Sequence, residues 1–220
     1  MKVIPLDPST FAGKARARIW FRFWGGVAHL LSLVVFRYRH HGGKFVPPTG
    51  GCLIASNHVS FADPPLVGVA CFPRETHYFA RKDLFNVPVL GRLMRSLNAI
   101  PVDRLQADVG GVRQLIRLLK EGEALVVFPE GTRTHDGEFR EPLPGIGMIV
   151  ARAGVPVVPA RIFGAEKAWP RHAKFPRFAR VSVRIGPPFR FELSDEESKS
   201  RETYQAISRE IMRRISELEP

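Results

Sequence analysis

Residues 52–58 read Cys-Leu-Ile-Ala-Ser-Asn-His, an apolar run that ends abruptly in polar residues. Apolar runs of this length are typical of strands that are buried on both faces of a sheet. Similar runs occupy residues 76–80, 98–102, 124–128 and 155–162, and residues 181–185 alternate as a half-exposed strand does. Helical patterns separate most of these runs. The alternation predicts one α/β domain with a mostly buried mixed sheet flanked by helices.

The helices are predicted from apolar periodicity and from the residues that begin and end them. Asp63-Pro64-Pro65 is typical of a helix start, with Asp63 as N-cap and proline in the first turn. Residues 84–97 are predicted to form a helix or a turn, and residues 143–153 a helix. Asp108 is the predicted N-cap of a helix that runs to Lys120. Ser194 is the predicted N-cap of an amphipathic helix at the end of the chain.

The charge of the chain predicts an anionic partner. Its 220 residues include 33 Lys and Arg against 21 Asp and Glu, a net charge of +12. Such a surplus favours nucleic acid, a phospholipid surface or a phosphorylated substrate. The distribution is uneven, because residues 8–62 and 167–191 contain no Asp or Glu.

The two cysteines, Cys52 and Cys71, lie in separate apolar runs and lack the spacing of zinc ligands. We therefore expect no metal site. No cleavable signal peptide is recognisable, so the reducing cytoplasm is the expected compartment.

The N-terminal segment, residues 1–44, combines aromatic residues with unopposed cations. Residues 19–36 are apolar apart from a few positions, and Gly25-Gly26 permits a break between two helices. Trp and Phe beside Arg and Lys favour a helical segment that lies in the membrane interface. The alternative is a helix that is buried on the protein's own core. Residues 45–220 then form the catalytic domain.

Polar residues that could carry chemistry follow several of the predicted strands. His58 directly follows the first strand, and Asp63 lies across the next turn. A carboxylate bonded to one ring nitrogen of a histidine stabilises the imidazolium and makes the other nitrogen an effective base. The alternative is that Asp63 only caps its helix and that His58 is an ordinary loop residue.

Two further strand ends carry positive charge. Glu130-Gly131-Thr132-Arg133 follows the strand at 124–128, where Gly131 allows a tight turn and Arg133 offers a planar fork suited to phosphate. Arg104 follows the strand at 98–102, and Lys82 follows the strand at 76–80. Glu130 and Arg133 could instead form a solvated pair on a surface loop, and Arg104 could pair with Asp103 or Asp108. Their convergence at strand ends is what a base beside an anion-binding site requires.

These stretches together resemble the four sequence blocks of the glycerophospholipid acyltransferases, the lysophosphatidic acid acyltransferase family. Asn57, His58 and Asp63 match the first block, and Glu130 to Arg133 match the third in full. Asp103-Arg104 matches the second block, although Asn98 stands where glycine is frequent. The fourth block is matched by Val155 to Pro159. The resemblance covers about residues 50–162.

The resemblance implies acyl transfer from a thioester, acyl-CoA or acyl-carrier protein, to the hydroxyl of a lysophospholipid such as 1-acyl-sn-glycerol 3-phosphate. It implies His58 as the base and Asp63 as its orienting partner. Arg133, Arg104 and Lys82 would hold the acceptor phosphate. Glu130 would position the loop or a glycerol hydroxyl, and Gly131 and Thr132 would complete the substrate-binding residues of this block. No metal and no cofactor besides the acyl donor is implied. The expected location is the cytoplasmic face of the cell membrane, in contact with its phospholipid.

Other functions are possible from the residues alone. Ser56 or Ser60 near His58 could belong to a serine hydrolase, but the chain lacks a Gly-x-Ser-x-Gly motif. The acceptor could be a different lysophospholipid or lysolipid. The net charge of +12 would also suit a nucleic-acid-binding or membrane-binding module without catalysis, although no helix-turn-helix or zinc finger is recognisable.

Overall fold

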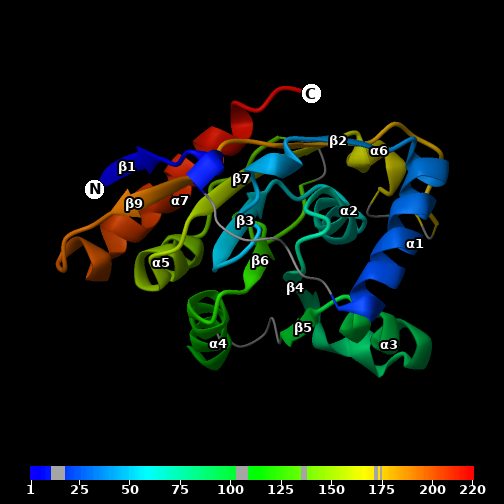
Figure 1. Ribbon diagram of the computed structural model, residues 1–220, viewed down its shortest axis with the longest axis horizontal. Coiled ribbons are helices and arrows are strands. Elements are labelled where there is room, and N and C mark those ends of the chain that lie inside the picture. Colours follow the sequence, from blue (N-terminus) through cyan, green and yellow to red (C-terminus); the bar gives the residue numbers. More distant parts are fainter. Residues whose placement is uncertain (11–17, 103–108, 135–137, 171–172, 174) are drawn as a thin grey trace.

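The computed structural model describes all residues except 11–17, 103–108, 135–137, 171–172 and 174. Its centre is a mixed sheet with the strand order β1-β9-β7-β3-β6-β4-β5 (Figure 1). Five consecutive strands, from β7 to the edge strand β5, are mutually parallel: β3 (Cys52–Ser56), β4 (Thr76–Arg81), β5 (Ala99–Val102), β6 (Ala124–Val127) and β7 (Val157–Phe163). Each of them lies within two residues of its predicted range. The predicted α/β class and mixed sheet are confirmed.

The remaining strands extend one side of the sheet. They are β1 (Lys2–Pro5), β2 (Arg39–His41), β8 (Ser182–Ile185) and β9 (Phe189–Glu192). β8 and β9 run antiparallel to β7, β1 pairs antiparallel with β9, and β2 pairs parallel with β8. The sequence pattern predicted β8 alone among these four strands. β1, β2 and β9 were not predicted from the sequence.

Helices cover both faces of the sheet. One layer contains α1 (Ile19–Phe36), α2 (Asp63–Ala70) and α3 (Pro88–Ser96), with the short α6 (Ala165–Ala168) beside them. The other contains α4 (Val109–Lys120), α5 (Pro144–Ala153) and α7 (Arg201–Ser216). Two apolar cores result, one under each layer.

The central strands supply both cores with alternate side chains. In β3, Ile54 belongs to the core under α2, whereas Leu53 and Ala55 belong to the core under α5 and α7. All three are completely buried. Because both faces of the strand are covered, every position must be apolar, which explains the continuous apolar runs in the sequence.

The N-terminal segment differs from its prediction in two respects. Its helix is one continuous element, α1, which passes through Gly25-Gly26 without a break and ends at Arg37 in a left-handed conformation, with φ 42°. Residues 1–44 also include β1 and β2, two strands of the sheet that the sequence did not predict. Within the described residues, α1 is the one helix that is long and apolar enough to cross a membrane by length and composition alone.

The last helix begins six residues later than predicted. Its N-cap is Ser200, whose side chain accepts a hydrogen bond from the Thr203 N–H. Ser194 exchanges hydrogen bonds with Glu197 as in a capping box, but it precedes a 3₁₀ helix over Glu197–Lys199. The predicted N-cap Asp108 lies outside the described residues.

Candidate active site

The candidate site lies where parallel strands end. β3 and β6 are neighbours, so the residues that follow them, His58 and Glu130, meet at one edge of the sheet. Lys82 follows β4, which pairs with β6, and is exposed at the start of a 3₁₀ helix (Lys82–Asn86). Arg104 follows β5 but lies outside the described residues. This edge is the usual ligand-binding edge of an open α/β sheet.

His58 and Asp63 are in direct contact. The distance from His58 Nδ1 to Asp63 Oδ2 is 2.8 Å, and the His58 side chain is 11% exposed while that of Asp63 is fully buried. The same carboxylate oxygen accepts hydrogen bonds from the N–H groups of Val59 and Ser60, at 2.6 and 2.7 Å. Three donors from one loop therefore converge on Asp63.

The prediction that Asp63 is the N-cap of its helix is wrong. The N-cap of α2 is Ala62, and Asp63 is the first residue of the helix. Its carboxylate points back to the loop that precedes the helix, because that loop supplies the hydrogen-bond donors. Burial raises the pKa of the Asp63 carboxyl, and the hydrogen bonds from His58, Ser60 and Val59 oppose that shift.

The His58 ring is fixed from two further sides. It stacks on Phe128, with ring centroids 4.2 Å apart and planes inclined by 22°. Its backbone N–H donates to Glu130 Oε1 at 3.1 Å, and its carbonyl accepts from the Thr134 N–H at 2.9 Å. With Nδ1 bound to Asp63, Nε2 is the nitrogen that can accept a proton from a substrate.

Glu130 holds the loops together. It is buried, and its second carboxylate oxygen accepts from the Arg140 N–H at 3.3 Å. Burial raises the pKa of this carboxyl, whereas the hydrogen bonds from the His58 and Arg140 backbone lower it. Gly131 next to it has φ 67°, and a Cβ there would approach Leu143 Cδ1 to 2.4 Å. Glycine is thus required for this turn.

Arg133 reaches the loop that carries His58. Its guanidinium carbon lies 3.5 Å from the centroid of the Phe61 ring, within cation–π range. Thr132, the residue before it, is half-buried. The structure therefore brings His58, Asp63, Glu130 and Arg133 together through two loops.

Asn57 has a positioning role that the sequence did not reveal. Its side-chain amide donates to the Ile162 carbonyl at 3.1 Å and accepts from the Ile162 N–H at 2.8 Å. These two bonds continue the pairing of β3 with β7 by one residue after β3 has ended. Asn57 thereby fixes the point at which the chain leaves the sheet toward His58.

The two serines near His58 are occupied elsewhere. Ser60 Oγ donates to the Trp169 carbonyl at 3.0 Å and accepts from the Ala62 N–H at 3.2 Å. Ser56 Oγ donates to Asn57 Oδ1 at 3.4 Å. Both serines are fully buried. A serine nucleophile must instead present its hydroxyl to the histidine and to the substrate.

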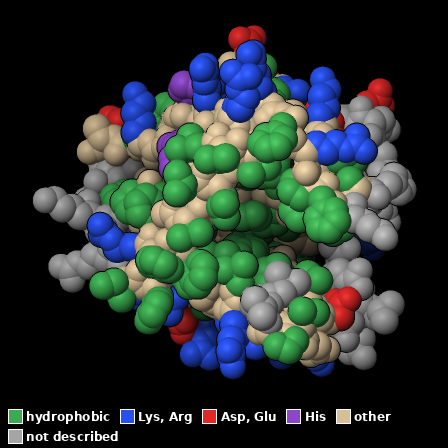
Figure 2. Space-filling view, turned by 90° about the vertical axis from the view of Figure 1, so that its right-hand side faces the viewer, with side chains coloured by type: hydrophobic (Ala, Val, Ile, Leu, Met, Phe, Trp, Pro, Cys, Tyr) green, Lys and Arg blue, Asp and Glu red, His purple; other side chains and the backbone are tan. Residues whose placement is uncertain are grey.

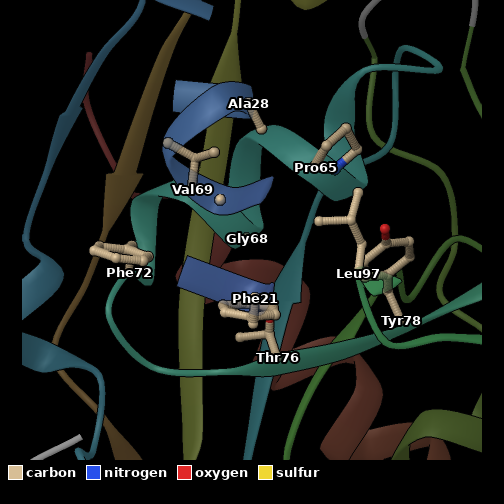
Figure 3. A pocket seen from close by; sticks show the side chains of 10 residues that line it. Phe21, Ala28, Pro65, Gly68, Val69, Phe72, Thr76, Tyr78 and Leu97 are labelled. Atoms are coloured by element: carbon tan, nitrogen blue, oxygen red, sulfur yellow. The ribbon is translucent and has the colours of Figure 1, made fainter. Parts of the chain in front are cut away.

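An apolar pocket lies between α1 and α2 (Figure 3). Its free volume is about 360 Å³, including space that is open to solvent. Its walls come from α1, α2 and the start of β4, and it is lined by Phe21, Gly25, Ala28, Pro65, Gly68, Val69, Phe72, Thr76, Tyr78 and Leu97. The pocket is therefore bordered by the helix whose first residue is Asp63.

Comparison with known proteins identifies the family of the chain. A family model described as Acyltransferase matches residues 37–163, and the chain belongs to that family. It is thus an acyltransferase by class.

The chain is 31% identical to the 1-acyl-sn-glycerol-3-phosphate acyltransferase of Bacillus subtilis over 175 residues, 79% of this chain and 84% of that protein. It is 30% identical to the protein of the same name from Pseudomonas aeruginosa, over 81% of this chain and 70% of that one. The crystal structure of the 1-acyl-sn-glycerophosphate acyltransferase of Thermotoga maritima superposes with a TM-score of 0.69. It is 25% identical, over 90% of this chain and 80% of that one. These relatives place the chain among the acyltransferases of phospholipid synthesis.

We expect Asp63→Asn to lower acyl transfer and, at the same time, to remove a pH-dependent loss of stability. Because burial raises the folded-state pKa of Asp63, its contribution to stability is present below the unfolded pKa of about 3.9 and is lost as the pH rises through the folded pKa. The wild type should therefore lose free energy of unfolding relative to the variant as the pH rises above the unfolded pKa of about 3.9. Urea unfolding at a series of pH values measures the difference, and an opposite slope would contradict the assignment. Acyl transfer should fall by about 100-fold or more.

We expect Asn57→Ala to lower turnover through the position of His58. The variant leaves the Ile162 N–H and carbonyl unsatisfied, which costs about 2 kcal/mol of unfolding free energy. Ser208→Ala is a matched control in the other helix layer, since its buried hydroxyl bonds the Gly147 N–H and the Leu143 carbonyl. At a temperature where both variants are folded, kcat should fall for Asn57→Ala alone. Equal kcat values would show that Asn57 serves stability only.

Proposed function

We propose that the chain transfers a fatty acyl group from acyl-CoA or acyl-carrier protein to the free hydroxyl of 1-acyl-sn-glycerol 3-phosphate, forming phosphatidic acid. The contact between His58 Nδ1 and the buried Asp63 carboxylate carries this proposal, because it prepares Nε2 as a general base. The names of the relatives from Bacillus subtilis and Pseudomonas aeruginosa support the choice of acceptor.

The proposed reaction needs a base, an acid and a stabilised oxyanion. His58 Nε2 takes the proton of the acceptor hydroxyl while its oxygen attacks the thioester carbonyl carbon. The tetrahedral intermediate collapses by breaking the C–S bond, and the imidazolium returns the proton to the leaving thiolate. Asp63 stabilises the imidazolium between these steps. We propose backbone N–H groups of these turns as the oxyanion donors, with His58 as both base and acid and with no metal or further cofactor.

The acceptor phosphate is proposed to bind on the positive side of this edge. Arg133 lies against Phe61, and Phe61 belongs to the loop that carries His58. Guanidinium binds phosphate in a bidentate manner, which orients as well as attracts it. Lys82 and Arg104 follow neighbouring strands at the same edge and are proposed to add to the positive field. Gly131 and Thr132 shape the loop between Glu130 and Arg133.

Helix α1 supports contact with a membrane. Its inner face, Phe21, Ala28, Ser32 and Phe36, packs on the protein or lines the apolar pocket. Its outer face exposes Ile19, Trp20, Phe23, Leu30, Leu31 and Val34. Figure 2 shows hydrophobic side chains gathered on this side of the molecule, with Lys and Arg around them. A continuous exposed apolar area of this kind marks a membrane or protein contact.

The location of the apolar pocket suits an alkyl chain. Its lining is apolar except for Thr76 and the Tyr78 hydroxyl, and it lies between α1 and α2. An acyl chain that leaves the bilayer along α1 would remain in apolar surroundings while its head group reaches the sheet edge. We propose the pocket as the site for part of an acyl chain, on the cytoplasmic side of the cell membrane.

His58→Ala should abolish acyl transfer while the protein remains folded, because the base is lost and no other described side chain is bonded to Asp63. Turnover with acyl-CoA and with acyl-carrier protein is measured by mass detection of the product. Ser60→Ala is the control: its hydroxyl bonds Trp169 and Ala62, so the variant should lose about 1 kcal/mol of stability and retain kcat. Loss of activity in Ser60→Ala as well as in His58→Ala would favour a hydrolase-type serine, and retained activity in His58→Ala would exclude His58 as the base.

Arg133→Ala should weaken binding of the phosphorylated acceptor more than it lowers kcat. Loss of one charged hydrogen-bonding partner costs about 1.5–3 kcal/mol, or about 10- to 150-fold in KM. The measurement compares 1-acyl-sn-glycerol 3-phosphate with a monoacylglycerol that lacks the phosphate. The wild type and the variant should have the same high KM for the phosphate-free acceptor. An unchanged KM for the phosphorylated acceptor would exclude the phosphate role.

A further inference from the structure

The segment Phe175–Arg180, between α6 and β8, exposes two large aromatic side chains. Phe178 is 82% exposed and Phe175 is 78% exposed, as much as Ile19 at the start of α1. Arg177 and Arg180 in the same segment are also exposed. Burying a phenylalanine side chain is worth about 1.5–3 kcal/mol. Two exposed phenylalanines so close together therefore indicate a surface that becomes covered by something else.

The segment is tied to the body of the protein on both sides. The Arg177 N–H donates to the Ala168 carbonyl at 2.7 Å, and Trp169 Nε1 donates to the Ala173 carbonyl at 3.1 Å. At its far end the Val181 N–H donates to the Phe36 carbonyl at 3.0 Å, which places the segment beside the end of α1 (Figure 1). These three hydrogen bonds fix the backbone from which the exposed side chains project.

The chemistry of the segment fits one occupant, the headgroup region of an anionic bilayer. Phenylalanine inserts into the boundary between headgroups and acyl chains, and arginine pairs with lipid phosphate just outside it. In Phe175-Pro176-Arg177-Phe178-Ala179-Arg180 the two types alternate within six residues, without an acidic residue. The segment is also next to α1, whose outer face is apolar.

We infer that Phe175–Arg180 is a second membrane-contacting element that inserts Phe175 and Phe178 into an anionic leaflet beside α1. This inference rests on the membrane contact of α1 that the proposed function includes. Two separate contacts fix the orientation of a protein on a surface, whereas one helix leaves it free to rotate about the helix axis.

The base of this element touches the active-site loop. Ser60 Oγ donates to the Trp169 carbonyl, and the Phe61 and Trp169 rings are 6.0 Å apart. Phe61 in turn lies against Arg133. Docking of the element therefore sets the height of the His58 loop above the bilayer. A lipid acceptor embedded in a vesicle should depend on it, and a short-chain acceptor dissolved as monomers should not.

The test uses the full chain with Phe175→Ser/Phe178→Ser and vesicles of phosphatidylcholine with phosphatidylglycerol. Because both side chains are exposed, thermal unfolding should be unchanged. Partitioning to the vesicles should fall at least about tenfold, as expected from the apolar area removed. KM for vesicle-embedded acceptor should rise, with kcat for a soluble short-chain acceptor unchanged. Undiminished partitioning would overturn the inference.

A charge-reversal pair tests the arginines. Arg177→Glu/Arg180→Glu should reduce binding to anionic vesicles more than to pure phosphatidylcholine. Arg113→Glu/Lys120→Glu changes the net charge equally, but on α4 in the other helix layer, and is the matched control. Equal loss for both pairs would show that only the total charge matters and would overturn the inference.

Insertion can also be observed directly. Cys52 and Cys71 are buried, so Phe178→Cys offers one accessible thiol for an environment-sensitive dye. Its emission should shift to the blue on anionic vesicles, and an unshifted spectrum would contradict insertion.

Two comparisons separate this inference from the proposed function. Trp20→Ser/Phe23→Ser removes apolar area from α1 alone. If this variant loses vesicle binding while Phe175→Ser/Phe178→Ser does not, the α1 contact stands and the second element is wrong. If neither variant loses binding, the membrane contact in the proposed function is itself wrong. If Phe175→Ser/Phe178→Ser lost turnover with acyl-carrier protein but not with acyl-CoA, and its vesicle binding stayed intact, the segment would be a binding site for acyl-carrier protein instead.

Discussion

The buried carboxylate of Asp63 is the constraint on which the rest of the site depends. A carboxylate that is completely removed from water must be compensated by hydrogen-bond donors. Here the donors are His58 Nδ1 and the N–H groups of Val59 and Ser60, so the loop after β3 has to fold back over the first turn of α2. The fold thereby converts the burial of one acid into a fixed orientation of the histidine.

The second support for His58 comes from the neighbouring strand. Because β3 and β6 are parallel and adjacent, their following loops meet, and Glu130 and Thr134 bond the N–H and the carbonyl of His58. Asn57 adds a connection to β7 on the other side. Residues that are far apart in sequence thus all contribute to holding the His58 imidazole in one orientation. This arrangement is the preorganisation that general-base catalysis requires.

The sequence predicted the parts of the fold that have a strong periodic signal and the parts of the site that follow strands. It failed where one signal had two physical meanings. An acid before two prolines is typical of an N-cap, yet Asp63 is at the first helical position and bonds the preceding loop. Ser194 and Ser200 each begin a capped turn, and only tertiary packing decides which of them starts α7. Asn98 adopts a left-handed backbone with φ 60°, which asparagine tolerates as glycine does.

The glycine pair Gly25-Gly26 is another sequence feature whose role becomes clear only in the structure. Glycine costs a helix about 1 kcal/mol per residue, so the pair permits a break. The helix nevertheless continues, because its inner face packs on the protein. Gly25 lines the apolar pocket, where a Cβ would stand 3.4 Å from the Phe72 ring and any longer side chain would fill the space between α1 and α2. The missing side chain at this position keeps the pocket open between the membrane-facing helix and the helix that begins at Asp63.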